Sequence, residues 1–95
     1  MINYHEPPES LSNPTRDTAR ALHSLKEEIE AIDWYHQRVE KCSNAQLKKI
    51  LEHNREEEIE HACALIEWLR KNMNGWDDNL KRNLFIKNDI NSIES

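Results

Sequence analysis

Mostly apolar side chains recur at alternating steps of three and four residues through the first half of the chain. The series consists of Leu22, Leu25, Ile29, Ile32, His36 and Val39. This spacing keeps the side chains on one face of a helix. Just before it, Asn13 can cap a helix and Pro14 suits the first helical turn, whereas residues 1–13 show no periodicity. The pattern predicts an N-terminal arm over 1–13 and a helix over 14–42.

The second half repeats the pattern after a short interruption. Ser43 and Gln46 have the spacing of a capping box, which predicts a second helix over 44–73 that ends at Asn74 and Gly75. A connection this short predicts an antiparallel hairpin of two long helices. Apolar residues then predict a short third helix over 76–87, followed by a polar tail over 88–95.

Composition favours a single all-α domain over 1–95. The chain has one glycine and three prolines, too few for the many turns of a sheet protein, and at 95 residues it buries little surface without a partner or a metal. A net charge of −5 argues against nucleic-acid binding, and the short apolar runs argue against membrane insertion. Cys42 and Cys63 are interpreted as two reduced thiols. These features predict a soluble, cytoplasmic protein.

The apolar face of the second helix becomes polar in its middle. At three-four steps the series reads Leu47, Leu51, Asn54, Glu58, His61, Leu65 and Trp68. Glu58 and His61 stand three residues apart, so they project from the same side of a helix, where leucine or isoleucine would be expected. A carboxylate at a core position costs several kcal/mol unless a cation or hydrogen bonds compensate it. Glu28 of the first helix flanks the apolar face opposite and offers a second carboxylate.

Two interpretations of this polar patch remain open from spacing alone. Glu28, Glu58 and His61 form a ligand set that suits iron(II), manganese or zinc. Alternatively, the polar residues bond to one another or set the register of a coiled coil. A di-iron helical bundle uses two Glu-x-x-His steps and two further glutamates, and this chain supplies half of that set. Two copies packed face to face would complete it.

Residues around the patch are less distinctive. Glu27 and Glu30 point to other faces of the helix, so spacing favours solvated acids over a second cation site. Tyr35 lies in the same row as Glu28, as a core hydroxyl or as a partner of metal ligands, whereas Trp34 packs elsewhere. His36 is interpreted as a core histidine whose hydrogen bonds are satisfied, with a supporting role near the metal as the alternative.

Several segments together resemble the encapsulated ferritins, a family of short ferritin-like proteins packaged inside encapsulin shells. They are "EEIEAIDWYHQRVE", "HNREEEIEHA", "IEWLRK" and the late "LF". The resemblance implies a protomer that forms a ferroxidase centre at a homodimer interface, within an open ring of ten chains. It implies di-iron ligands at Glu28, Glu58 and His61, with Tyr35 among the catalytic residues and Trp34 beside the site.

The resemblance also changes the interpretation of two acids. Glu27 and Glu30 match the acids that line the family's metal entrance and a secondary cation site, which could hold calcium. The implied activity is oxidation of Fe(II) by oxygen inside an encapsulin nanocompartment, and the alternative is a non-catalytic metal-binding or structural helical assembly protein. Family members end in a tail with a short apolar docking peptide. The sequence printed to Ser95 shows none, so either that segment is missing or the cargo role is lost.

Overall fold

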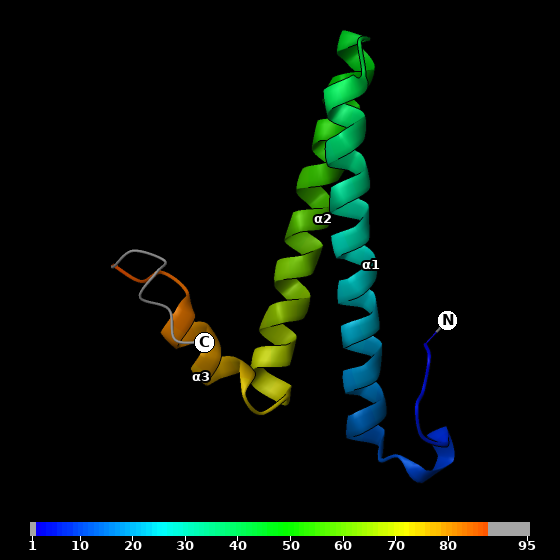
Figure 1. Ribbon diagram of the computed structural model, residues 1–95, viewed down its shortest axis with the longest axis vertical. Coiled ribbons are helices and arrows are strands. Elements are labelled where there is room, and N and C mark those ends of the chain that lie inside the picture. The colour runs from blue at the N-terminus through cyan, green and yellow to red at the C-terminus, as the bar shows by residue number, and fades with distance from the viewer. Residues whose placement is uncertain (1, 88–95) are drawn as a thin grey trace.

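Two long antiparallel helices make up most of the chain. The computed structural model describes residues 2–87, in which α1 spans Asn13–Lys41, α2 spans Ala45–Asn72 and α3 spans Trp76–Asn83. A single 3-10 turn, η1, covers Pro8–Ser10 in the N-terminal arm. Figure 1 shows α1 and α2 side by side, with α3 leaving the end of α2 at an angle. The expected all-α class and helical hairpin are confirmed for the described residues.

Both long helices begin at a capping residue next to the expected one. Ser12 caps α1, and its side chain accepts a hydrogen bond from the Thr15 amide at 3.3 Å. Asn44 caps α2 and accepts from the Leu47 amide at 2.9 Å, so the capping box expected at Ser43 and Gln46 does not form. Serine and asparagine cap helices about equally well, so the residue types do not decide which of two adjacent residues is the cap. The backbone path of the segment before the helix decides it.

The end of α2 also differs from the expectation. Met73 ends α2 in an extended conformation, and Gly75 takes a φ of +101° as the N-cap of α3. A positive φ is easily adopted only by glycine, which explains the single glycine at this turn. Helix α3 ends at Asn83, short of the expected residue 87, and Phe85 follows with a φ of +55°. The expected tail at 88–95 lies outside the described residues.

The hairpin encloses a narrow core. Its buried side chains are Ala21, Leu25, Val39, Ala62 and Leu69. Several residues of the expected apolar series lie outside it: Leu22, Ile29, His36, Leu47, His61 and Trp68 are exposed. The interior row of α2 instead passes through Ala62 and Leu69, one position later. In a hairpin of two helices, each helix buries only one row of side chains against the other. Because the apolar face of each helix is broader than one row, a second row of apolar side chains stays exposed.

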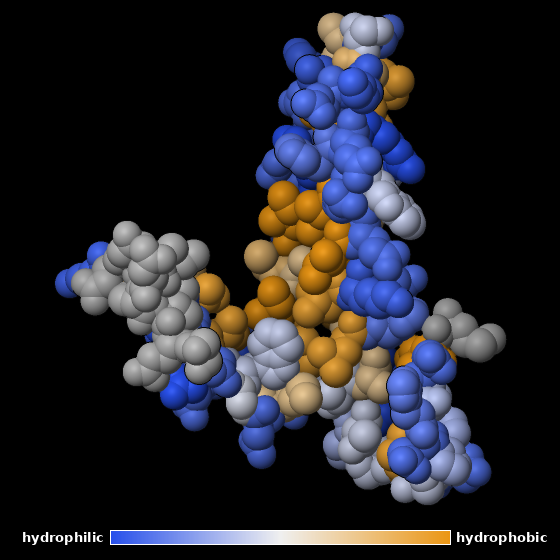
Figure 2. Space-filling model, in the orientation of Figure 1, coloured by the Kyte–Doolittle hydropathy of each residue, from blue (hydrophilic) through white to orange (hydrophobic). Residues whose placement is uncertain are grey.

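The uncovered row leaves large apolar side chains exposed on the protomer. Figure 2 shows a continuous hydrophobic area over both long helices in the half of the hairpin remote from their connection. The total accessible surface of the chain, polar and apolar together, is 7829 Å², against roughly 5,700 Å² for a compact monomer of its mass. Such a surface is typical of a protein that associates. Within residues 2–87, no helix combines the length and apolar character needed to cross a membrane.

Candidate metal centre

One cluster of potential metal ligands bridges the two long helices. Glu28 extends from α1, whereas Glu58 and His61 extend from α2. One ligand atom from each residue lies within 4.8 Å of the other two. The Nδ1 atom of His61 is 3.6 Å from Oε2 of Glu28 and 3.7 Å from Oε2 of Glu58. The structure therefore brings together the three residues that the sequence singled out.

Local helix geometry and the hairpin both contribute to this arrangement. Glu58 and His61 are three residues apart, which puts them on neighbouring positions of the α2 surface. The antiparallel packing of α1 then places Glu28 opposite them. The two glutamate side chains are half-buried, at 23% and 24% exposed, whereas the imidazole of His61 is 55% exposed.

The position of His61 corrects the sequence interpretation in one respect. His61 was expected on the inner face of the hairpin, but Ala62 takes the buried position. A small alanine lets the two helices approach closely. His61 lies at the edge of that contact, in the same row of α2 as the exposed Trp68, seven residues later. Its imidazole is consequently open to a molecule that covers this face.

The cluster has unsatisfied acceptor capacity. Oε2 of Glu28 is buried and has no hydrogen-bond partner within the described part of the chain. Both contacts of His61 exceed 3.5 Å, so they are too long for hydrogen bonds. A buried carboxylate oxygen without a donor is costly. A cation between the three side chains would remove that cost.

The donor set and spacing suit a divalent transition metal. Ligands bound at about 2.1 Å to one ion lie roughly 3.0–3.5 Å apart. The two distances from Nδ1 of His61, 3.6 and 3.7 Å, would need to shorten only slightly, which side-chain rotation can supply. Two carboxylates and an imidazole are ligands for iron, manganese or zinc, and three protein ligands leave coordination positions open.

The other predicted site residues do not belong to this cluster. Glu27 and Glu30 are exposed, and Oε1 of Glu27 is 3.6 Å from Nε2 of His23. Trp34 is 53% exposed, whereas Tyr35 is half-buried. Their roles beside the metal centre stay predictions.

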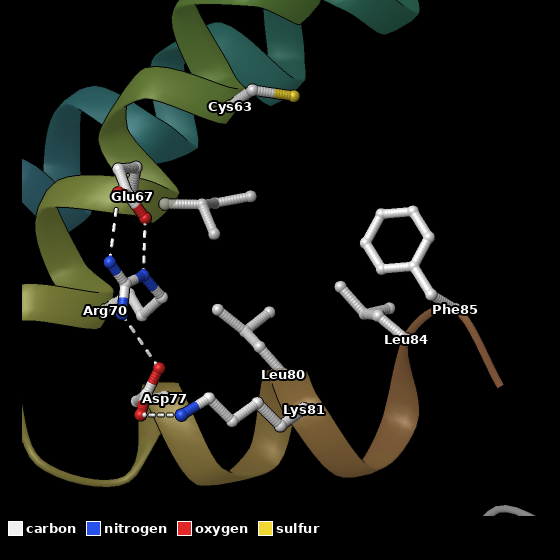
Figure 3. Close-up of a pocket in the computed structure, with 9 residues that line it drawn as sticks. Cys63, Glu67, Arg70, Asp77, Leu80, Lys81, Leu84 and Phe85 are labelled. Carbon is white, nitrogen blue, oxygen red and sulfur yellow. Dashed lines mark hydrogen bonds and ion pairs between the residues drawn. The ribbon is translucent and has the colours of Figure 1, made fainter.

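A basic residue near the end of α2 organises a second polar cluster. The guanidinium of Arg70 donates to Glu67 on α2 and, at 2.9 Å, to Asp77 on α3 (Figure 3). These contacts lower the pKa of Glu67, mainly through the hydrogen bond from Arg70. The pKa of Asp77 is lowered first by its hydrogen bond with Lys81 and then by Arg70. The hydrogen bond with Glu67 is the main cause that raises the pKa of Arg70.

This polar cluster borders an open groove of about 630 Å³ between α2 and α3. Figure 3 shows Leu80, Leu84 and Phe85 projecting from α3 and the segment after it toward the side of α2 that carries Cys63. Sequence reasoning did not identify Arg70 as important. Its contact with Asp77 crosses the turn at Gly75, and the pattern of the residues does not reveal the angle of that turn.

Comparison with known proteins places this geometry in context. The sequence profile of the family described as EncFtn-like matches residues 3–87. A "Ferritin-like protein" of Thermotoga maritima is 57% identical over 96% of this chain and 80% of its own length. An "Encapsulated ferritin-like protein" of Rhodospirillum rubrum is 46% identical over 96% of this chain, which spans 65% of that relative. The crystal structure of protein ne0167 from Nitrosomonas europaea superposes with a TM-score of 0.87 at 50% identity, covering 93% of this chain and 97% of that chain.

Proposed function

The chain belongs to the EncFtn-like family of ferritin-like, iron-related proteins, and we propose that it is a ferroxidase. It would oxidise Fe(II) with oxygen at a di-iron centre. The observation that carries the proposal is the cluster of Glu28, Glu58 and His61. It contains a buried carboxylate oxygen that only a cation or a donor from elsewhere can satisfy. The two distances from Nδ1 of His61 to the carboxylate oxygens are only slightly longer than the spacing that one ion requires.

A single protomer supplies half of a di-iron ligand set. Helical di-iron sites use four glutamates and two histidines, and this hairpin provides two glutamates and one histidine. The missing half can come from a second copy packed on the exposed apolar face beside His61. In a symmetric dimer the same residues would then line both sides of the centre.

Each ligand has a distinct part in the proposed reaction. Glu28, from the helix opposite the other two ligands, is proposed to bridge two Fe(II) substrate ions, while Glu58 and His61 of each protomer hold one ion. Two Fe(II) ions together supply two electrons, the number that reduces oxygen to the level of hydrogen peroxide. The open coordination positions give oxygen access to the ions.

Residues outside the cluster are assigned supporting parts. We assign Glu27 and Glu30 to an entrance and secondary cation site, which could take calcium, because their exposed carboxylates attract divalent cations. Tyr35, on the same helix as Glu28, is assigned to the catalytic centre. Trp34 is assigned to the surface next to it.

The proposed assembly is a ring of ten chains inside an encapsulin shell, which would store the ferric product. The name of the Rhodospirillum rubrum relative, "Encapsulated ferritin-like protein", supports the encapsulin shell in this proposal. The large apolar surface supports association of protomers.

A non-catalytic assembly protein is the alternative function. A protonated His61 could form ion pairs with Glu28 and Glu58 at the observed 3.6 and 3.7 Å. The cluster would then hold the two helices in register, or bind a structural zinc ion, without redox chemistry.

Anaerobic loading with Fe(II) followed by exposure to air separates the two functions. A ferroxidase gives a near-ultraviolet ferric absorbance that forms faster than in buffer and at a rate proportional to protein concentration. Bovine serum albumin at equal concentration controls for non-specific effects. A rate equal to that of buffer alone would contradict the proposal.

A further inference from the structure

One long-range hydrogen bond between α1 and α2 lies outside the proposed metal centre. Nη1 of Arg55 on α2 is 3.1 Å from Nδ1 of His36 on α1. Within residues 2–87, the only other polar contact between side chains of these two helices is that of His61 with Glu28. The remaining contacts between the helices are apolar, through side chains such as Leu25 and Ala62.

The chemistry of the two side chains settles the direction of this bond. A guanidinium donates hydrogen bonds and cannot accept them. Nδ1 of His36 must therefore accept, which requires a neutral imidazole with its proton on Nε2. The side chain of Arg55 is 22% exposed, whereas His36 is exposed, so the bond lies at the surface of the hairpin. Its second amino group, Nη2, lies 3.5 Å from Glu56, which orients the guanidinium further.

The bond lies close to the metal cluster along the hairpin. His36 is eight residues from Glu28 on α1, or roughly 12 Å at 1.5 Å per residue. Arg55 is six residues from His61 on α2, or roughly 9 Å. Both displacements point toward the connection between the helices, so the hydrogen bond and the cluster are neighbouring contacts along one helix pair.

The apolar contacts between α1 and α2 resist one movement, the rotation of a helix about its own axis, less strongly than the others. The three residues between Lys41 and Ala45 limit sliding of α1 along α2. The buried cluster contains two alanines, Ala21 and Ala62, beside Leu25 and Leu69. The alanine side chains have little shape to interlock, so at these positions the packing resists rotation of either helix about its own axis only weakly. A directional polar contact sets such an orientation, as buried polar residues do in coiled coils. A modest rotation would move Glu28 away from Glu58 and His61.

We propose that the hydrogen bond from Arg55 to His36 is a positioning contact, which holds α1 and α2 in the rotation that places Glu28 opposite Glu58 and His61 before metal binds. This inference rests on the proposed iron site. It assigns no catalytic role to Arg55 or His36, because neither belongs to the ligand cluster.

Binding of Co(II) to the full-length chain tests the proposal without turnover. Anaerobic titration, followed by the visible absorbance of Co(II), gives the dissociation constant for wild type, His36→Ala, Arg55→Gln and the double variant. We expect each single substitution to weaken binding by about three- to tenfold, because one charge-assisted hydrogen bond is lost. The double variant should bind no more weakly than either single variant, because both remove the same contact.

Control variants distinguish positioning from general effects. Lys49→Gln removes the same charge from an exposed position of α2 and should leave Co(II) affinity unchanged. His36→Gln retains an acceptor and should recover part of the affinity. Additive losses in the double variant, or unchanged affinity in both single variants, would overturn the positioning role. So would a loss of helix content by circular dichroism in both, which would indicate a general folding role.

Two further measurements separate this inference from the proposed function. If Glu58→Ala binds Co(II) as tightly as wild type, the proposed site itself is wrong. If Glu58→Ala loses binding while the His36 and Arg55 variants keep it, only the positioning role fails. Nitrogen-15 NMR of metal-free protein should show His36 with an unprotonated Nδ1, and a protonated Nδ1 at neutral pH would refute the hydrogen bond.

Discussion

At the scale of single residues, the metal ligands give the most direct prediction. Glu58→Ala and His61→Ala should each lower the Fe(II) oxidation rate at least about 100-fold, because each substitution removes two ligands from one shared centre. Stopped-flow absorbance after anaerobic loading measures the rate. Glu60→Ala, an exposed glutamate on the same helix, is the matched control. Near-normal rates in both ligand variants would show that these residues are not the ligands.

The exposed acids of α1 have a different expected effect. Glu27→Ala and Glu30→Ala should slow metal uptake by a few-fold and leave the oxidation step intact, since neither side chain belongs to the ligand cluster. Anomalous scattering from crystals soaked in calcium locates any cation beside them. A well-ordered crystal with no peak near either carboxylate would favour the interpretation of Glu27 and Glu30 as ordinary solvated acids.

At the scale of helices, the Arg70 cluster sets how α3 responds to acid. The pKa values of Glu67 and Asp77 lie below their ordinary values of 4.5 and 3.8. A lowered pKa in the folded state stabilises the fold above the ordinary pKa, and this stabilisation is lost as pH falls through the lowered value. The contacts of α3 with α2 should therefore weaken below about pH 4.

Arg70→Gln tests this dependence. The variant lacks the hydrogen bond that is the main cause of the lowered pKa of Glu67, and it lacks the second cause for Asp77, whose hydrogen bond with Lys81 remains. It should therefore lose less stability than wild type between about pH 5 and pH 2. Urea unfolding at several pH values, followed by circular dichroism, measures the difference. Lys49→Gln controls for the change in net charge. Identical pH dependence in wild type and Arg70→Gln would mean that the exposed ion pairs contribute nothing measurable.

At the scale of the whole molecule, assembly is expected to depend on metal. Two hairpins that meet at the cluster would bring together at least four carboxylates, from Glu28 and Glu58 of each copy. Their repulsion and desolvation oppose the association that the apolar surface favours. A divalent cation neutralises the cluster, and because it binds the associated state preferentially, it stabilises that state by mass action.

Adding Fe(II) under anaerobic conditions should consequently convert small species into dimers and then larger rings. A strong chelator should reverse this, and it is a cleaner reagent than acid, which protonates carboxylates and histidine together. Native mass spectrometry or analytical ultracentrifugation records the distribution of oligomers. The same distribution with and without metal, at a concentration where small species are detectable, would refute the linkage and leave the ferroxidase proposal untouched.

Local chemistry along the chain was sufficient to predict the helices and to single out Glu28, Glu58 and His61, which the structure brings together. The three-four spacing of apolar residues indicated two long helices, and the short link between them required an antiparallel hairpin. Glu58 and His61 were recognisable because a carboxylate and an imidazole interrupt an apolar series. Glu28 was recognisable because an acid flanks the facing series. These inferences need only helical periodicity, which is a local property of the backbone.

The tertiary structure alone decided which of two neighbouring rows is buried. Ala62 and Leu69, not His61 and Trp68, face α1, because the closest approach of two helices selects small or well-fitting side chains within a broad apolar face. The same packing brings Arg55 to His36, and the turn at Gly75 brings Arg70 to Asp77. Such contacts depend on helix rotation and on the angle of a turn. Both depend on contacts between residues that are far apart in the sequence, so no local pattern of residues reveals them.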